Sequence, residues 1–467
     1  MNTTRRFRRK KWSRDEIQVA EPAATHRSIQ GTAIGNFMEW YDFGVYGYIA
    51  TTIARVFYPG NTASAVHLIA TFGTLAAAFA VRPLGGFFFG PLGDRIGRKR
   101  VLMITILLMT TGTTATGLLP GYQTIGMWAP ILLVVARMFQ GFSTGGEFVG
   151  AMIYVSEHAP DRRRGMMGGF LPLGSQGGYV AAGALVTALQ TWLPAGEMLS
   201  WGWRIPLLLS APLGLVALYM RLRLEESPAF EEMSDRDKAS NDSGGQQFRR
   251  TVVEQWRPLL ICIGLVLAYN VGDYMLTGFM PTYLQTIVRI GRTAGLVMIV
   301  ATLMTLMIVV VFVARLSDHI GVKPIMWTGC GLLVVASIPA FMLLGSGASY
   351  PVMFTGVLLI GAMVLCFDST APSALPALFP TNVRYGALAI GFNISISAFG
   401  GTTPLIAQAL ISGSGNVMAP AYMLIGAGLV GAVTLLFTPE VAGKRLPGSP
   451  PSVETEDEAR ELANEVE

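Results

Sequence analysis

Ionisable side chains interrupt several long apolar segments of this chain, where charged residues are rarely found. Glu39 and Asp42 stand three residues apart in the first of these segments, so they share one face of a helix. Two carboxylates this close resist simultaneous ionisation, which suits a proton carrier. Glu39 could equally be the structural partner of Arg82 or Arg137. Because a charge inside a bilayer is costly, all four are candidate functional residues.

Further candidates lie in later apolar segments. Glu147 follows Arg137 by ten residues, which is near three helical turns, so we expect both on roughly the same side. Glu147 could carry a proton or steer a substrate. Asp273 and Asp368 place negative charge in the second half of the chain, whereas the two arginines place positive charge in the first. This split suits a zwitterion, whose carboxylate needs an arginine and whose cationic nitrogen needs a carboxylate or aromatic faces.

Aromatic residues next to these charges are candidate substrate contacts. Trp40, Tyr41 and Tyr46 could supply faces for a cation, as could Tyr274, although helix packing explains each of them as well. We find no nucleophile paired with a base, no HExxH, no phosphate-binding glycine loop and no metal-ligand cluster in the sequence. We therefore predict no enzyme activity, no metal and no cofactor, with the proton as coupling ion.

The composition predicts that these residues lie in a membrane protein. The chain has 467 residues, of which 52% are hydrophobic and 13% charged, against roughly 25% charged residues in a soluble domain. The net charge of +5 comes from basic residues clustered at the ends of apolar segments. Such clusters set membrane topology and do not indicate nucleic-acid binding. The three cysteines all lie inside apolar segments, so they do not predict a disulfide framework.

Segments of about 20 apolar residues predict twelve transmembrane helices. They cover approximately residues 31–57, 65–90, 100–119, 124–156, 165–191 and 204–222, and then 257–287, 293–314, 324–345, 350–373, 383–411 and 418–437. The domains that follow are a basic arm (1–30), a six-helix half (31–222), a polar linker (223–256), a second six-helix half (257–437) and an acidic tail (438–467).

Repeated sequences relate the two halves. Asp94-x-Ile-Gly-x-Lys recurs as Asp318-x-Ile-Gly-x-Lys, and Pro160-x-x-x-Arg164-Gly recurs as Pro380-x-x-x-Arg384-x-Gly. Parallel six-helix halves are the arrangement in which one central site opens alternately to each side, so a transporter is the leading hypothesis. Basic loops fall on the side of the amino-terminal arm, which predicts an inner-membrane protein with both termini in the cytoplasm.

The segment 93–100, together with Arg82-Pro-Leu-Gly-Gly, closely resembles the signature loop of the major facilitator superfamily. We expect it to form a short turn between two helices. The resemblance implies a latch that holds the outward-facing state. Its basic residues could also act only as topology signals. The candidate latch residues are Gly93, Asp94, Arg95, Gly97, Arg98 and, in the second half, Asp318.

A second resemblance lies on the fourth predicted helix, in Arg137-x-x-Gln140-Gly141-x-x-x-Gly145-Gly-Glu147. In the superfamily this motif holds a buried arginine that is linked to proton transfer. For Gly141 and Gly145 we expect a packing role, because small residues four apart let a neighbouring helix approach closely.

Three segments narrow the resemblance to the metabolite:proton symporters, and among them to those that import osmoprotectants such as proline and glycine betaine. They are Gly35-Asn-x-x-Glu-Trp-Tyr-Asp-Phe-Gly, Trp201-Gly-Trp-Arg-Ile-Pro and Glu225-Glu-Ser-Pro-Ala-Phe. The chain departs from the osmosensing pattern in its short acidic tail and in Asp273 and Asp368, which stand where uncharged residues are expected.

These observations predict a proton-coupled symporter for a small zwitterionic compatible solute, with the lipid bilayer, protons and the solute as its partners, functional as a monomer. A proton symporter of an organic anion, such as a dicarboxylate or a shikimate-like acid, is the alternative, and the two arginines would then bind the anion. A membrane enzyme, a non-transporting sensor and a drug-exporting antiporter fit the sequence less well.

Overall fold

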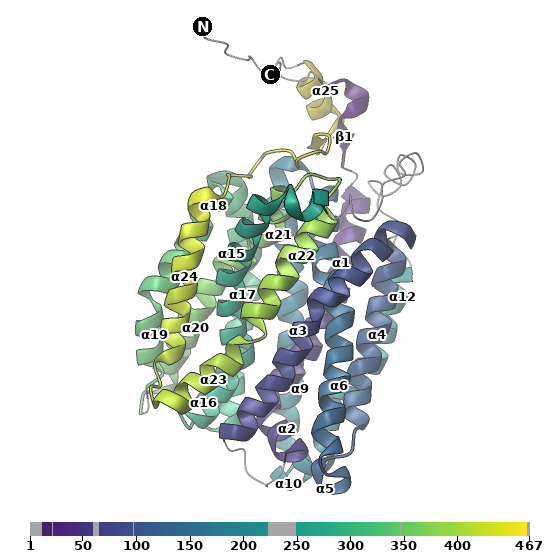
Figure 1. The fold of residues 1–467 in the computed structure, drawn as a ribbon. Coiled ribbons are helices and arrows are strands. Elements are labelled where there is room, and N and C mark those ends of the chain that lie inside the picture. The colour runs from purple at the N-terminus through teal and green to yellow at the C-terminus, as the bar shows by residue number, and fades with distance from the viewer. Residues whose placement is uncertain are drawn as a thin grey trace.

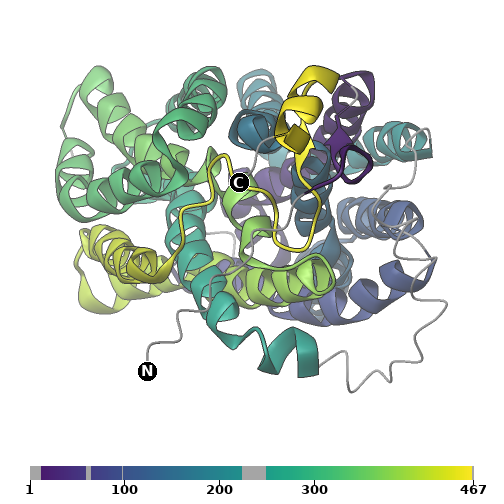
Figure 2. The ribbon, with the colours of Figure 1, turned by 90° about the horizontal axis from the view of Figure 1, so that it is seen from above.

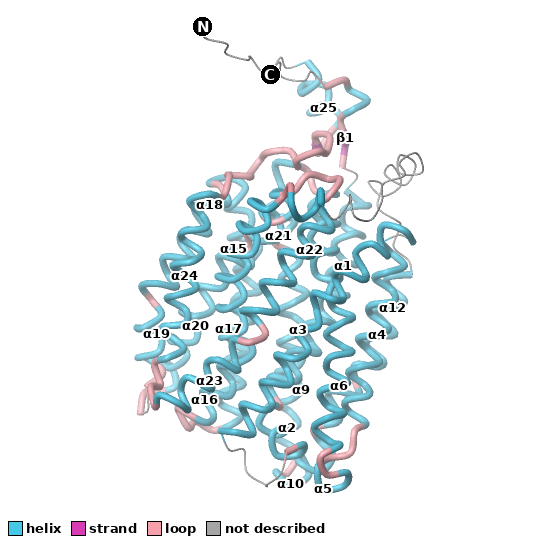
Figure 3. The backbone as a smooth tube through the Cα atoms, viewed as in Figure 1, coloured by secondary structure: helices cyan, strands magenta, loops and turns pink. Residues whose placement is uncertain are grey.

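The fold is a bundle of long helices with a small folded element at one end (Figure 1). The computed structural model describes residues 12–20, 22–58, 65–96, 98–222, 249–345 and 347–464. Seen from above, the helices of the first part of the chain and those of the second part form two groups side by side (Figure 2). Nearly the whole trace is helical, and only two short strands interrupt this pattern in the described residues (Figure 3).

Six spans form the first half. The first consists of α1 (Pro22–Tyr48) and α2 (Ala50–Phe57), the second of α3 (Ala65–Ile96) and the third of α4 (Arg98–Leu118). The fourth consists of α5 (Tyr122–Ile125), α6 (Trp128–Ser143), η2 (Thr144–Gly146) and α7 (Glu147–His158). The fifth and sixth consist of η3 (Asp161–Arg163), α8 (Arg164–Gly168), α9 (Phe170–Trp192), α10 (Ala195–Glu197), η4 (Met198–Gly202), α11 (Arg204–Leu208) and α12 (Ser210–Leu222).

The second half repeats this layout. Its first span contains η5 (Arg249–Val253), α15 (Trp256–Tyr274), η6 (Met275–Phe279) and α16 (Met280–Thr286), and its second is α17 (Arg292–Ile320). The third is the bent pair α18 (Val322–Val335) and α19 (Ser337–Leu343). The others are formed by α20 (Tyr350–Asp368), α21 (Ala371–Ala374) and η7 (Pro376–Leu378), by α22 (Arg384–Ser395), η8 (Ile396–Gly400) and α23 (Thr403–Ser414), and by α24 (Ala419–Phe437).

Apolar length alone recognises only part of this bundle. Among the described residues, eight helices are long and apolar enough to cross a membrane, or nine if the bent pair α18 and α19 is one span. The other three crossings contain α1, which carries Glu39 and Asp42, the interrupted pair α6 and α7, and α9 with its polar residues Ser175 and Gln176. The predicted twelve-helix architecture in two halves is confirmed. Buried charged residues do not by themselves prevent recognition, because the recognised spans include those of Arg82, Asp273 and Asp368.

Several spans lose regular α-helical geometry in their middle. A 3-10 turn, η2, separates α6 from α7 in the first half, and the π-helical turns η6 and η8 interrupt two spans of the second. Each irregular turn contains glycine, which lowers the cost of departing from the helix. Such turns often mark functional sites, because they redirect the side chains that follow.

Some predicted boundaries were wrong. The turn expected over residues 93–100 is helical for most of its length, since α3 continues to Ile96 and α4 begins at Arg98. Gly97 and the side chains of Asp94, Arg95 and Arg98 lie outside the described part, as does the burial of Gly93. The first helix begins at residue 22, before the predicted 31, and helix η5 begins at residue 249 within the predicted linker.

Segments near the two ends of the chain pair above the bundle (Figure 1). Strand β1 (Gln18–Val19) pairs in parallel with β2 (Ser452–Val453), close to η1 (Arg14–Glu16) and α25 (Glu456–Asn464). Arg14 forms an ion pair with Glu456, and the guanidinium of Arg445 lies 5.0 Å from the centre of the Trp12 ring. The sequence did not predict this pairing, because two-residue strands carry no recognisable periodicity.

The repeated Pro-x-x-x-Arg sequences also contact the tail. Arg164 donates a hydrogen bond to the carbonyl of Lys444 (2.7 Å), and Arg384 donates one to the carbonyl of Pro447 (2.8 Å). Both arginines are buried, and Arg384 also forms a 2.9 Å ion pair with Glu157 of the other half. The tail thus crosses both halves at corresponding arginines.

The packing role expected for the glycines of α6 and η2 is confirmed. A Cβ atom on Gly141 would lie 1.9 Å from the carbonyl oxygen of Ala78, and one on Gly145 would lie 2.4 Å from that of Arg82. Helix α3 therefore approaches this span at backbone distance, which brings the buried side chain of Arg82 to the centre of the first half.

Candidate functional site

Arg82 and Glu39 form a buried ion pair in the first half. The Arg82 Nη2 lies 2.7 Å from the Glu39 Oε1, and both side chains are at most 1% exposed. The guanidinium also lies 5.6 Å from the Phe43 ring centre and 5.2 Å from that of Phe79. Glu39 therefore has the structural partner that the sequence offered as one of its two roles.

Asp42 is surrounded by neutral donors, although it lies on the same helix as Glu39. Thr113 of α4 donates a hydrogen bond of 2.6 Å to the Asp42 Oδ2, and Gln140 of α6 donates one of 3.3 Å to the same oxygen. Within the described part of the chain, Asp42 is in no ion pair, and its Oδ1 is buried without a hydrogen bond. Its charge would therefore lack a directly bonded counter-ion.

Arg137 reaches Asp42 only through Gln140. Its Nη1 donates a 2.5 Å hydrogen bond to the Gln140 Oε1, and its guanidinium carbon lies 4.0 Å from the Tyr46 ring centre. The amide of Gln140 therefore bridges the arginine to the carboxylate. Tyr46 covers this arginine and donates its hydroxyl to the Thr71 carbonyl (3.1 Å), so it contacts a cation of the protein itself.

Glu147 forms a second buried ion pair, with Arg221 at 3.1 Å. The expectation that Glu147 would lie on the same side as Arg137 assumed one continuous helix, and η2 breaks that helix between them. The sequence analysis did not single out Arg221, which stands at the end of an apolar segment. Nothing in its local pattern distinguishes a buried arginine from a topological one.

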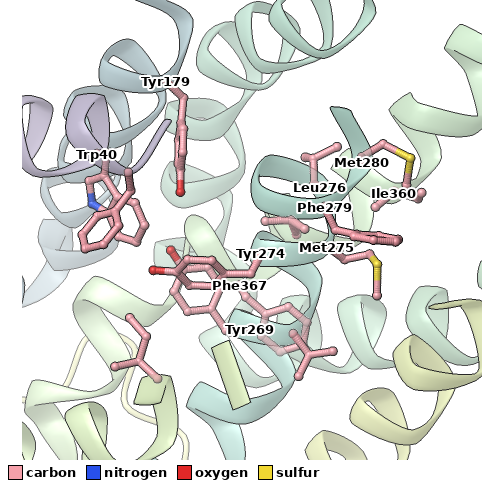
Figure 4. Close-up of a cluster of buried hydrophobic side chains, with 14 of the residues drawn as sticks. Trp40, Tyr179, Tyr269, Tyr274, Met275, Leu276, Phe279, Met280, Ile360 and Phe367 are labelled. Carbon is pink, nitrogen blue, oxygen red and sulfur yellow. The ribbon is translucent and has the colours of Figure 1, made fainter. Parts of the chain in front are cut away.

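A small cavity lies between the two halves. It is lined by Trp40, Ser175, Gln176 and Tyr179 from the first half and by Tyr269, Asp273, Asp368 and four aliphatic residues from the second. Its interior space is about 10 Å³, which holds about one water molecule. Figure 4 shows Trp40 and Tyr179 opposite Tyr269 and Tyr274 at this interface.

The carboxylate of Asp368 is fully hydrogen-bonded in this cavity. Its Oδ1 accepts a 2.6 Å hydrogen bond from the Tyr269 hydroxyl, and its Oδ2 accepts one of 2.8 Å from the Gln176 amide. Asp273 also lines the cavity and is 7% exposed. The structure thus brings together Asp273, Asp368 and Trp40, but it keeps Arg82 and Arg137 out of the cavity wall.

The aromatic residues predicted to contact the substrate lie in different places relative to the cavity. Trp40 packs against Tyr179 and Tyr274, with ring centres 5.5 and 6.0 Å apart. Tyr274 lies beside the cavity but does not line it. Tyr41 points elsewhere, since its hydroxyl donates to the carbonyl of Pro206 (2.8 Å). The sequence analysis missed Gln176, Tyr179 and Tyr269, whose signal was a polar or aromatic residue inside an apolar segment.

Asp318 joins the two halves at the end of the bundle where the chain termini meet. Its two carboxylate oxygens accept hydrogen bonds from the backbone N–H groups of Gly165 (2.7 Å) and Met166 (2.8 Å), at the beginning of α8. A Cβ atom on Gly165 would lie 2.5 Å from this carboxylate, so only glycine allows the approach. The helix N-terminus favours the negative charge.

Further contacts between the halves close both ends of the bundle. On the side of the termini, the Tyr385 hydroxyl donates to the carbonyl of Gly146 (3.2 Å). Towards the opposite end, the rings of Phe72 and Phe279 pack with their centres 6.1 Å apart. The halves are therefore in contact towards both ends of the bundle.

A second carboxylate secures the helix that follows Asp318. Glu440 accepts hydrogen bonds of 3.0 Å from the N–H groups of Val322 and Lys323, at the beginning of α18, and others from Val441 and Ala442. Partial burial raises the pKa of Glu440, but these hydrogen bonds outweigh it and hold the pKa below its ordinary value. The acid thus fixes the end of α24 to the turn after α17.

The chain is similar in sequence to known transporters. The family model described as "Sugar (and other) transporter" matches residues 29–243 and 229–450. The glycine betaine/proline/ectoine/pipecolic acid transporter OusA of Dickeya dadantii is 41% identical over 97% of this chain and 90% of its own length. The proline/betaine transporter of Escherichia coli K12 is 41% identical over 96% of this chain and 90% of its own length.

Solved structures share the fold at lower identity. The proton:xylose symporter XylE bound to 6-bromo-6-deoxy-D-glucose has a TM-score of 0.75 at 16% identity, and covers 91% of this chain and 98% of its own. A partially occluded inward-open form of XylE from Escherichia coli has a TM-score of 0.68 at 17% identity, over 91% of this chain and 100% of its own.

Two six-helix halves around a closed polar cavity define a transporter of the major facilitator fold. The chain belongs to the sugar (and other) transporter family of that superfamily, and it is a multi-pass membrane transporter of small solutes, not an enzyme.

Replacing Asp318 with asparagine is expected to loosen the contact between the halves at this end. An amide has one acceptor oxygen, so one of the two bonds to α8 is lost, and a hydrogen bond to a charged group contributes about 1.5–3 kcal/mol. We expect a Ser156→Cys reporter, buried in this interface, to react with a maleimide about tenfold faster in detergent solution. Asp457→Asn, on exposed α25, is the control. An unchanged rate would show that Asp318 does not hold this end closed.

Proposed function

We propose that this protein is a proton-coupled symporter that imports a small zwitterionic solute of the proline or glycine betaine type by alternating access. The observation that carries the proposal is the cavity between the halves, which has two carboxylates and aromatic rings but no basic side chain in its wall. Such a site suits the cationic nitrogen of a zwitterion. The names of the relatives that are 41% identical support the same solute class.

The buried charges of the first half support a proton as the coupling ion. Glu39 and Glu147 are each bonded to an arginine, so their negative charge is compensated where they lie. Among the described residues, Asp42 accepts hydrogen bonds from two neutral donors and forms no ion pair. Because an uncompensated charge inside the membrane is costly, a bound proton would lower the cost of moving this half. We infer that Asp42 carries the proton.

Arg137 provides a second state for this acid. Two of its nitrogens, Nε and Nη2, are buried without hydrogen bonds, and Gln140 stands between it and Asp42. When Asp42 releases its proton, a shift of Gln140 would let the arginine and the carboxylate pair directly. Protonation of Asp42 would then break its ion pair with Arg137 and restore the hydrogen bonds to Thr113 and Gln140. This exchange would give the halves two discrete packings.

Solute entry requires that the halves separate. The closed cavity has space for about one water molecule, which is much less than a proline molecule needs. The bonds of Asp318 close the end that bears the termini, and we propose that this end faces the cytoplasm of a bacterial inner membrane. Breaking these bonds would open the cavity inward, while the opposite contacts remain closed.

The test is uptake into proteoliposomes under an imposed pH gradient. Labelled proline and glycine betaine are expected to accumulate only when the outside is acidic, and a labelled dicarboxylate is expected not to. The alternative, a proton symporter of organic anions, predicts the reverse result and would place the anion on Arg82 or Arg137. Accumulation of the dicarboxylate alone would reject the zwitterion proposal.

A further inference from the structure

The cavity between the halves contains more hydrogen-bond acceptors than the protein satisfies. Because the Gln176 NH₂ group must face the carboxylate of Asp368, its Oε1 points away, and this oxygen is buried without a donor. Gln176 is 3% exposed and lines the cavity. The hydrogen bond from the Gln176 amide to Asp368 fixes the orientation of this side chain, so its Oε1 cannot turn towards another donor.

Asp273 adds a carboxyl group to the same wall. None of the described residues donates a hydrogen bond to its side chain. The Thr277 hydroxyl bonds to the backbone carbonyl of Asp273 instead. The protein offers few donors nearby. The Trp40 N–H is committed to Asn36, so the hydroxyls of Ser175 and Tyr179 are the donors that remain in the wall. The wall therefore holds acceptor oxygen that the described residues leave without a donor.

The charge of the cavity has the same sign throughout. Among the described residues that line it, Asp273 and Asp368 are the carboxylic acids, and no lysine, arginine or histidine is present. The nearest candidate cations of the sequence analysis are bound elsewhere, Arg82 to Glu39 and Arg137 to Gln140. Any charge on this wall is therefore negative, which favours a cationic group on the ligand where it touches the wall.

We propose that this cavity selects a cationic nitrogen that carries N–H bonds, so that primary and secondary ammonium solutes bind in preference to quaternary ones. The proposal rests on the proposed function and narrows its substrate class from zwitterions in general to the proline type. An N–H group satisfies the orphaned oxygens of Gln176 and Asp273, whereas N-methyl groups cannot. A site built to hydrogen-bond a substrate N–H discriminates strongly against the analogue that lacks it.

The aromatic rings alone would favour the opposite order. Trp40 and Tyr179 present π faces, and such faces recognise quaternary ammonium groups through their quadrupoles. If these rings were the main contact, methylation of the nitrogen would leave affinity unchanged or raise it. The unsatisfied oxygens decide between the two, because burying them against methyl groups leaves polar atoms without partners.

A methylation series on one skeleton tests the proposal. Proline, N-methylproline and N,N-dimethylproline carry two, one and no N–H bonds on the nitrogen and share the carboxylate. Their binding to purified protein is measured by ligand-induced shift of the melting temperature. We expect the half-saturating concentration to rise in this order, by at least tenfold from proline to N,N-dimethylproline. Equal or tighter binding of N,N-dimethylproline, or binding of none of the three, would overturn the inference.

Asp273→Asn supplies the matched variant, because it keeps the shape of the side chain and removes its charge. We expect the variant to bind proline at least tenfold more weakly, whereas Asp457→Asn on α25 binds it as the wild type does. Wild-type affinity in Asp273→Asn would also count against the proposal. Binding is measured without a gradient, so it is independent of transport. A failure of proton-driven accumulation in proteoliposomes would reject the proposed function without deciding the preference for N–H groups.

Discussion

Asp42→Asn is expected to abolish proton-driven accumulation of the solute. A gradient of about one pH unit can drive at most about tenfold accumulation with one proton per solute, because one pH unit corresponds to about 1.36 kcal/mol. Asparagine resembles protonated aspartate and retains the bonds to Thr113 and Gln140 in part. The variant should therefore equilibrate the solute across the membrane without concentrating it.

Two measurements separate this result from a general loss of function. Exchange of labelled for unlabelled solute without a gradient should persist in Asp42→Asn, since that reaction requires no net proton movement. Asp457→Asn should accumulate solute as the wild type does. If Asp42→Asn still concentrates its solute several-fold, another acid carries the proton, and the ion-paired Glu39 and Glu147 become the candidates.

Arg82→Met is expected to cause the largest loss of stability among single replacements of the buried charges. It leaves Glu39 buried without its cation, which costs about 3–5 kcal/mol when one partner of a buried pair is removed. The replacement also removes the contacts of the guanidinium with the rings of Phe43 and Phe79. A lowered melting temperature of the purified protein in detergent would report this loss.

The double variant Glu39→Gln with Arg82→Met is the control for charge. It removes the unpaired carboxylate along with the arginine, so most of the stability should return. If the double variant is as unstable as Arg82→Met alone, packing of the arginine explains the loss and the ion pair does not. If Arg82→Met is as stable as the wild type, the pair contributes nothing measurable to the fold.

The architecture could be predicted because it depends on local chemistry. Segments of about 20 apolar residues, polar interruptions and repeated Asp-x-Ile-Gly-x-Lys sequences indicated twelve spans in two halves, and the fold confirms this. The limits were also local. The turn expected at 93–100 proved helical up to Ile96, because glycine and charge near a helix end are compatible with a last turn as well as with a loop.

The partners of the buried charges could not be predicted in the same way. Helical periodicity shows which side chains share a face, as it did for Glu39 and Asp42, but it does not show which helix that face meets. Glu39 meets Arg82, whereas Asp42, one turn further along, meets Thr113 and Gln140. Glu147 pairs with Arg221, a residue that the sequence analysis did not single out.

From its sequence alone, the chain was determined to be a two-half membrane transporter with acids and arginines inside its spans, because hydropathy and motif spacing are properties of contiguous residues. Only the tertiary structure decided which of these charges compensate one another and which face the cavity. The reason is physical: ion pairs and hydrogen bonds act over about 3 Å. Helix packing, not distance along the chain, brings Gln176 to Asp368 and leaves Asp42 without a directly bonded cation among the described residues.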